Sequence, residues 1–381
     1  MFRTAFRLPV KILGIPLKVD LSFLIILPLL AWIIGSNVPA FVEAFRLGID
    51  PEVLASGLMP YWLGLAAAVG LFASVVIHEL GHAVVGMRLG LKVKDITLWL
   101  LGGVARFADM PRRQGREAIV AVAGPATSFG IAMVLYFLLP QIPPDQAALR
   151  FLTAYLLVMN LVVGAFNLLP AIPLDGGRIL RSLLALRFPY LQATRISAGV
   201  SRTLAVLLGL VGFATLSPFL MLIAFFVFMA VSGETTQATM REVLEHVPVT
   251  DVMAKEVESV RAELAVGALL DRMLEDGYHG YPVLDAEGRL AGMVTLEGVK
   301  RRKRAGQIAP DTRVGEIMST GNCSIPASAT AFEAFQKMAQ DGGDRIAVID
   351  ADRSVRGIIS KTDLLRSVQV RDLERELAEN A

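Results

Sequence analysis

The sequence predicts a polytopic α-helical membrane protein, with six transmembrane helices and short β elements, followed by a soluble α/β unit made of two repeats. Hydrophobic residues form 54% and charged residues 19% of the 381 residues, and the mean hydropathy is +0.56. Ordinary soluble domains have about 45–50% and about 25%. Charge is uneven, because residues 1–240 carry a net +7 and residues 241–381 a net −5. Finally, the polar half aligns with itself at an offset of 65 residues.

Six segments are apolar enough to cross a bilayer, which takes about 20 residues each. The last two are joined only by the turn around Ser217 and Pro218, so they form either a helical hairpin or one kinked span. Residues 1–19 are too basic and too often interrupted by proline for a signal peptide, and they alternate as β-strands do. The six segments lie near 21–36, 61–87, 118–139, 151–169, 203–216 and 218–233.

Lysine and arginine predict the orientation of the chain in the membrane, because basic loops stay in the cytoplasm. All basic residues of the first 240 fall on one side of the predicted spans except Arg46 and Arg150. We therefore expect a multi-pass protein of the cell membrane, in contact with the lipid bilayer, whose N-terminus and polar C-terminal half are both cytoplasmic.

The second apolar segment contains two histidines four residues apart. His78 and His82 fall on one face of a helix, so both imidazoles can reach one metal ion, and Glu79 can reach water at that ion. Ionisable side chains within a span are costly unless they face a cavity or a metal. The pattern therefore predicts a catalytic metal site, and the structural alternative is a pair of hydrogen-bonded core histidines.

A catalytic zinc usually has three protein ligands and a water, so a third ligand is needed. Cys323 is the only cysteine, and the other histidines, His246 and His279, lie in the polar half. The remaining acids of the first half lie in loops or at span ends, apart from Asp175. Prolines and glycines break the helix around it, and such backbone is tolerated at membrane depth where it lines a cavity. We expect Asp175 to be the third ligand, although it could also cap a helix beginning at Gly176.

Four stretches of the first half together resemble the site-2 protease family of intramembrane zinc metalloproteases. They are the HExxH segment, the NxxPxxxxDG run over 167–177, the Gly102-Gly103 loop and the Gly14-Ile15-Pro16 hairpin. The resemblance implies one zinc per chain, bound by His78, His82 and Asp175. It also implies that Glu79 activates water and that Asn167 helps to hold substrate or to stabilise the intermediate.

The loop between the second and third segments is also implicated by this resemblance. Gly102, Gly103 and Val104 would belong to a membrane-dipping strand or loop whose edge binds an extended substrate. Proteases bind substrates as strands through main-chain hydrogen bonds, so a helical substrate must first unwind. An ordinary turn is the alternative.

The third segment departs from the family at one position. The family often has an asparagine after the Ala-Gly-Pro of this segment, where this chain has Ser128 after Ala123-Gly124-Pro125-Ala126-Thr127. We expect this departure to lie away from the ligands and to alter only local helix packing.

The polar half consists of two copies of one unit. The copies are similar to a pair of cystathionine-beta-synthase-type (CBS) domains, over 246–304 and 311–371, which often bind adenine nucleotides. This resemblance implies that Ser360 and Asp363 bind the ribose of AMP, ADP or ATP. The first copy retains Thr295 but has Gly298 at the aspartate position. Residues aligned by the 65-residue offset include Met253 with Met318, Asp285 with Asp350, and Gly292 with Gly357.

These observations together predict a zinc metalloendopeptidase that cleaves membrane-anchored proteins within or near their transmembrane segments, modulated by adenine nucleotide. Two alternatives are a CBS-gated membrane transporter and a non-proteolytic metal-binding scaffold. A transporter would need buried charges along a path, whereas the acids within the spans are confined to Glu79 and the nearby Asp175. An intact Glu79 argues against the scaffold. A homodimer through the CBS domains is possible, and we expect no nucleic acid among the partners.

Overall fold

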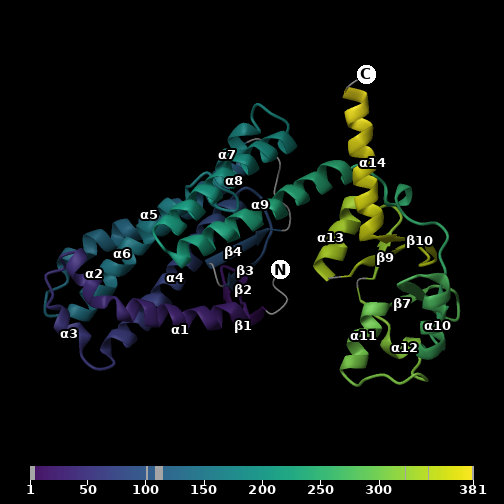
Figure 1. Cartoon of the computed structure of the whole chain (residues 1–381), viewed down its shortest axis with the longest axis horizontal. Coiled ribbons are helices and arrows are strands. Elements are labelled where there is room, and N and C mark those ends of the chain that lie inside the picture. Colours follow the sequence, from purple (N-terminus) through teal and green to yellow (C-terminus); the bar gives the residue numbers. More distant parts are fainter. Residues whose placement is uncertain (1–4, 100–101, 108–114, 322, 342, 380–381) are drawn as a thin grey trace. The chain divides into compact units, whose positions relative to one another are not determined.

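A computed structural model describes residues 5–99, 102–107, 115–321, 323–341 and 343–379 of the chain (Figure 1). The chain divides into two compact units, Met1–Thr235 and Thr236–Ala381. The first unit is a helical bundle with a small sheet, and the second is a repeated α/β structure. The predicted combination of an apolar helical part and an α/β repeat is therefore confirmed.

The first unit contains the long apolar helices. Among the described residues, α4, α5, α6, α8 and α9 are long and apolar enough to cross a membrane, and α1 with α2 forms a sixth candidate if this pair, bent by 56°, is one span. The helices of this unit are α1 (Leu21–Ser36), α2 (Val38–Ala44), α3 (Pro51–Ala55), α4 (Met59–Arg88), α5 (Arg116–Leu138), the 3-10 helix η1 (Leu139–Gln141), α6 (Ala147–Asn167), α7 (Asp175–Leu184), α8 (Tyr190–Ala214) and α9 (Pro218–Leu244).

The last two apolar segments form separate helices that fold back on each other. Ala205 of α8 and Val227 of α9 pack in the same cluster, although each lies about ten residues from the connecting turn. A Cβ atom on Gly212 would lie 2.9 Å from the backbone nitrogen of Met221, so the helices are also in close contact next to the turn. This arrangement is a helical hairpin rather than a single kinked span.

Close packing of α1 fixes α4, which carries the HExxH motif. A Cβ atom on Gly64 would lie 2.0 Å from the carbonyl oxygen of Ala31, and one on Gly35 would lie 2.8 Å from the carbonyl oxygen of Pro60. Small residues allow helix backbones to approach in this way in membrane proteins. On its other sides α4 packs against α5 and α6.

A four-stranded sheet lies beside α4, with the strand order β1-β2-β3-β4. β1 pairs antiparallel with β2, as the predicted N-terminal hairpin requires, β2 pairs parallel with β3, and β3 pairs antiparallel with β4. The stretch predicted to present an edge to substrate forms β4, one of the two edge strands, while Leu100 and Leu101 lie outside the described residues. The strands are β1 (Phe6–Ile12), β2 (Ile15–Val19), β3 (Val93–Trp99) and β4 (Gly102–Phe107).

A buried carboxylate links three of these strands. Asp95 on β3 accepts two hydrogen bonds from Arg106 on β4, at 2.6 and 2.7 Å, and pairs with Lys18 on β2 at 2.9 Å. Burial alone would raise the pKa of the Asp95 carboxyl group, but the hydrogen bonds and charges of Arg106 and Lys18 outweigh burial and lower this pKa. The ion pairs hold β4 in register against β3.

The second unit contains two copies of one fold, as the 65-residue offset predicts. The corresponding helices and strands α10 and α13, β6 and β9, β7 and β10, and α11 and α14 each begin 65 residues apart. Each copy forms a three-stranded sheet, β5-β6-β7 or β10-β9-β8. Their bounds are η2 (Val249–Asp251), β5 (Val260–Arg261), α10 (Val266–Asp276), β6 (Gly280–Leu284), β7 (Leu290–Thr295), α11 (Leu296–Arg304), α12 (Val314–Ile317), β8 (Ser324–Pro326), α13 (Ala331–Asp341), β9 (Arg345–Ile349), β10 (Val355–Ser360) and α14 (Lys361–Glu379).

The repeated methionines and glycines join the two copies. A Cβ atom on Gly357 of the second copy would lie 2.4 Å from the sulfur of Met253, which precedes the first copy's sheet. In return, a Cβ atom on Gly292 would lie 2.9 Å from the sulfur of Met318. Each copy therefore leaves room at its glycine for the methionine of the other.

Candidate metal centre and active site

The two histidines of α4 and the aspartate of α7 converge on one point. His78 and His82 are each 3% exposed, and Asp175 is 6% exposed. The Nε2 atoms of the two histidines lie 3.3 Å apart. Oδ2 of Asp175 lies 3.3 Å from Nε2 of His78 and 3.2 Å from Nε2 of His82. Three potential ligand atoms thus form a nearly equilateral triangle inside the protein.

This triangle has the dimensions of one face of a zinc coordination tetrahedron. Zinc binds histidine nitrogen and carboxylate oxygen at about 2.0–2.2 Å, so the edges of a regular tetrahedron measure about 3.3–3.6 Å. The separations of 3.2–3.3 Å match that value closely. Asp175, His78 and His82 therefore fit a zinc ion with a fourth position left open.

The Nδ1 nitrogens of both rings have hydrogen-bond partners that suit metal binding through Nε2. Nδ1 of His82 lies 2.8 Å from the carbonyl oxygen of Val120, which can only accept, so Nδ1 carries the proton and the lone pair of a neutral ring is on Nε2. Nδ1 of His78 lies 2.9 Å from Oγ of Ser128, which can accept in the same way. Such partners orient metal-binding histidines and raise their basicity.

The position of Ser128 corrects one expectation. We expected the departure from the family's asparagine to lie away from the ligands, but Ser128 is fully buried and contacts the ring of His78. Because α5 packs against α4, Ser128 contacts His78 although it lies 50 positions later in the chain. The departure therefore concerns the orientation of His78 and not only helix packing.

The broken backbone before α7 places Asp175. The amide of Ile172 donates a hydrogen bond to Oγ of Ser201 on α8, at 2.8 Å, which anchors the loop. Cβ atoms on Gly176 and Gly177 would lie 2.2 and 2.3 Å from backbone atoms of the preceding loop, so both glycines are needed for the tight turn. Leu174 occupies the N-cap position of α7, and the Asp175 side chain is directed to the imidazoles rather than capping the helix.

Glu79 lies beside the triangle and contacts the sheet. Its Oε2 accepts a hydrogen bond of 2.8 Å from the amide of Ala105 on β4. One ligand-type atom from each of His78, Glu79 and His82 lies within 4.8 Å of the others. A Cβ atom on Gly103 would lie 2.7 Å from Cγ of Glu79, so glycine is needed where β4 passes this side chain.

The other predicted residues of this site are distributed around it. Gly102, Gly103 and Val104 lie on β4, next to α4. Backbone polar groups alternate between the two sides of an antiparallel strand, so the groups of Gly103 face away from β3, as those of Ala105 do. Asn167 donates a hydrogen bond to the carbonyl of Val163 in its own helix, at 3.0 Å, and within the described chain it makes no hydrogen bond to the three potential ligands.

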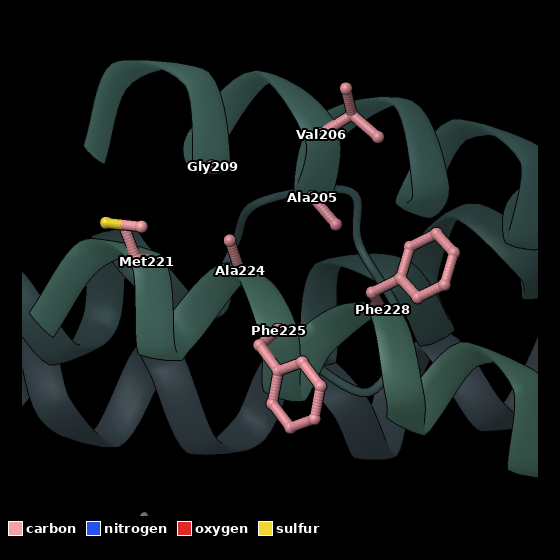
Figure 2. A pocket seen from close by; sticks show the side chains of 7 residues that line it. All are labelled: Ala205, Val206, Gly209, Met221, Ala224, Phe225 and Phe228. Atoms are coloured by element: carbon pink, nitrogen blue, oxygen red, sulfur yellow. The ribbon is translucent and has the colours of Figure 1, made fainter. Parts of the chain in front are cut away.

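An open groove of about 250 Å³ lies between α8 and α9, and all the side chains that line it are apolar (Figure 2). Its side chains offer no ionisable group for acid–base chemistry or for binding zinc. The lining residues are Ala205, Val206, Gly209, Met221, Ala224, Phe225 and Phe228.

In the second unit, the predicted nucleotide residues lie at the starts of two helices. Oδ2 of Asp363 accepts hydrogen bonds from Oγ and the amide of Ser360, at 2.6 and 2.9 Å, at the start of α14. Thr295 caps α11 by accepting a hydrogen bond from the amide of Gly298 at 3.1 Å. Arg345 is paired with Ser360 across β9 and β10, and its Cδ lies 3.5 Å from the Cβ position of Gly280, which is paired with Thr295.

Sequence reasoning missed the support around the metal site. A Cβ atom on Gly124 would lie 2.2 Å from Nε2 of His82 and 2.5 Å from Nε2 of His78, so this glycine keeps the space between the two nitrogens open. The Ala-Gly-Pro motif is the sequence signal for this glycine, but a motif does not show that the glycine faces the histidines. The contribution of Val120 comes from its backbone, so no residue type indicates it.

Comparisons with known proteins show the family to which the chain belongs. Residues 66–147 and 141–211 match the Peptidase family M50, and residues 249–304 and 314–370 match the CBS domain. The chain belongs to the site-2 protease family of zinc metalloproteases and carries two CBS domains. The predicted family and the predicted zinc metalloprotease class are thereby confirmed.

Individual relatives extend over almost the whole chain. The zinc metalloprotease MJ0392 of Methanocaldococcus jannaschii is 30% identical over 96% of this chain and 97% of its own length. Rip3 of Mycobacterium tuberculosis is 29% identical over 94% of this chain and 92% of its own length. Among solved structures, a site-2 protease from Methanocaldococcus jannaschii is 32% identical and covers 61% of this chain and 95% of its own, with a TM-score of 0.44.

Proposed function

We propose that this zinc metalloprotease cleaves membrane-anchored proteins within or near their transmembrane segments, with His78, His82 and Asp175 as ligands of one zinc. The triangle of 3.2–3.3 Å formed by their ligand atoms carries the proposal. The site lies on α4, an apolar helix long enough to span a bilayer, so the bonds that it reaches are at membrane depth. Enclosure by helices keeps the polar groups away from lipid.

The residues around the triangle have complementary roles in hydrolysis. Zinc, when bound, supplies Lewis-acid chemistry that polarises the peptide carbonyl and makes water more acidic. Glu79 accepts the proton of the attacking water and returns it to the amide nitrogen as the carbon–nitrogen bond breaks. The hydrogen bond from Ala105 keeps the Glu79 carboxylate beside the ligands.

Substrate would be held as an added strand. β4 is an edge strand, and main-chain hydrogen bonds to an edge bind a peptide of any sequence. The outward groups of Gly103 are next to Glu79, so a strand paired there brings its peptide bonds to the site. Asn167, at the end of α6, is proposed to contact substrate or the intermediate after leaving its intrahelical hydrogen bond.

The metal assignment predicts that His82→Ala and Asp175→Ala each reduce zinc affinity by more than about 100-fold, beyond the 10–100-fold typical of losing an outer partner. Purified full-length protein would be analysed for zinc and incubated with a single-span substrate, with and without chelator. We expect one zinc per chain and chelator-sensitive cleavage. His246→Ala, which changes an exposed histidine of the second unit, is the control. Full zinc occupancy in both ligand variants would contradict the assignment.

We further infer a multi-pass location in the cell membrane, with the N-terminus and the CBS domains in the cytoplasm. The asymmetric loop charges support this orientation. An even number of spans supports it as well, provided that α1 and α2 together make one crossing.

Binding of AMP, ADP or ATP to the CBS pair is the proposed means of regulation. Ser360 and Asp363 would bind the ribose, with Thr295 at the equivalent helix start of the first copy. Nε of Arg345 is buried and has no hydrogen-bond partner in the part of the chain that the structure describes. A cation with an unused donor close to these residues favours a ligand that carries phosphate.

Asp363→Ala is expected to weaken nucleotide binding by about 10-fold or more, since a hydrogen bond to a charged group contributes roughly 1.5–3 kcal/mol. Calorimetry on the full-length protein with each nucleotide measures the effect, and cleavage assays in parallel show whether binding changes activity. Asp271→Ala, at an exposed position on α10, is the matched control. No heat at millimolar nucleotide with folded protein would leave dimerisation as the role of the CBS pair.

A further inference from the structure

A buried ion cluster lies six residues along α7 from Asp175, which is between one and a half and two turns. Arg181 is 4% exposed and forms ion pairs with Glu117 on α5 and with Glu234 on α9, the latter at 2.8 Å. Its guanidinium also lies over the ring of Tyr190, with 5.4 Å to the ring centroid. One arginine therefore connects α7 with α5, α8 and α9, although none of these contacts involves His78, His82 or Asp175.

The cluster fastens the two helices that complete the metal site around α4. Glu117 lies less than one turn before Val120, whose carbonyl orients His82, and Arg181 lies on the helix that begins with Asp175. A second contact at the same level joins the helices, because the amide of Ala118 donates to Oγ of Ser182 at 3.2 Å. α5 and α7 therefore cannot slide past each other without breaking both contacts.

The metal site depends on the relative position of these helices. The Asp175 carboxylate comes from α7, whereas the partners that orient both imidazoles, Val120 and Ser128, come from α5. Zinc sites require ligand distances within about 0.2 Å of their ideal values. A small shift of α7 along α5 would enlarge the triangle and weaken the binding of zinc.

We propose that Arg181 is a positioning residue that sets the distance between Asp175 and the two imidazoles by locking α7 onto α5 through Glu117. Arginine suits this task because its planar fork can reach two carboxylates at once, as it does here with Glu117 and Glu234. A lysine keeps the positive charge, but its compact ammonium group lacks the planar fork with which arginine reaches both carboxylates. This proposal rests on the proposed zinc ligands.

Zinc affinity of the full-length protein, measured by competition with a chelator, tests the proposal. We expect Arg181→Lys to bind zinc about 10-fold more weakly than wild type, at the low end of the loss found when an outer partner is removed. Glu117→Gln should have a similar effect. Glu234→Gln should change affinity less than about 3-fold, because it leaves the link between α5 and α7 intact. Cobalt-substituted protein should show a changed visible spectrum in Arg181→Lys and in Glu117→Gln only.

Two controls separate positioning from general stability. Arg187→Lys changes an exposed arginine just after α7, and the structure shows no ion pair for Arg187 within the described chain. Thermal unfolding in the presence of chelator reports the stability of each metal-free variant. Wild-type zinc affinity in Arg181→Lys, or equal weakening in Glu234→Gln, would overturn the proposal while leaving the metal site intact. Absence of zinc from the wild type would overturn both.

Discussion

Glu79→Gln is expected to retain one zinc per chain and to lose proteolysis, with a fall in rate of about 10²–10⁴-fold. This range is typical of removing a general base and corresponds to about 3–5 kcal/mol of activation free energy. The amide has the shape of the carboxylate, and its oxygen can still accept the hydrogen bond from Ala105. Only the ability to accept a proton is removed, so kcat should fall far more than KM rises.

The measurement combines zinc analysis with cleavage of a single-span substrate at saturating concentration. Glu43→Gln makes the same chemical change at an exposed position on α2 and should leave both quantities unchanged. Near-normal turnover by zinc-loaded Glu79→Gln would mean that another residue is the base.

Gly124→Ala is expected to abolish tight zinc binding although it adds only one methyl group. The added Cβ would lie 2.2 Å from Nε2 of His82 and 2.5 Å from Nε2 of His78, where ordinary contacts exceed 3.0 Å. The methyl group would fill the space between the two coordinating nitrogens, so we expect a loss of more than about 100-fold in affinity, above the range for outer partners. Helix formation itself favours alanine over glycine by about 1 kcal/mol.

Gly130→Ala is the matched control, since it makes the same substitution on the same helix. A Cβ at Gly130 meets no atom within 4 Å. This variant should keep wild-type zinc affinity and unfold at the same temperature as wild type or higher. If Gly124→Ala also binds zinc normally, the two imidazoles cannot converge as described.

The residues proposed as ligands could be predicted from the sequence, because each is an ionisable side chain in an apolar or broken helical segment, at a spacing that one mechanism explains. His78 and His82 are four residues apart in an apolar segment, and Asp175 stands where prolines and glycines break a helix. Their supports could not be predicted in this way. Val120 acts through its backbone, and Ser128 meets His78 across 50 residues of chain.

The second unit was easier to predict than the first. Its repeat carries its own internal comparison, and the corresponding helices and strands begin 65 residues apart. In the first unit, apolar composition marks each long helix but carries no information about its neighbours. The sequence therefore cannot distinguish a hairpin of α8 and α9 from one kinked span. It also predicts that Arg181 is a loop cation, whereas this residue is buried between Glu117 and Glu234.

The reciprocal contacts of Met253 with Gly357 and of Met318 with Gly292 have a consequence for how the CBS pair can be divided. Each repeat provides a methionine side chain that packs on a glycine of the other repeat. A single repeat would therefore have an unfilled space beside its glycine and an exposed methionine thioether. The two repeats are expected to unfold in a single thermal transition. If the chain is cut between them, each half should be insoluble by itself and should recover its structure only when the halves are mixed. Such a pair is therefore expected to be kept together as one unit when it is joined to other proteins.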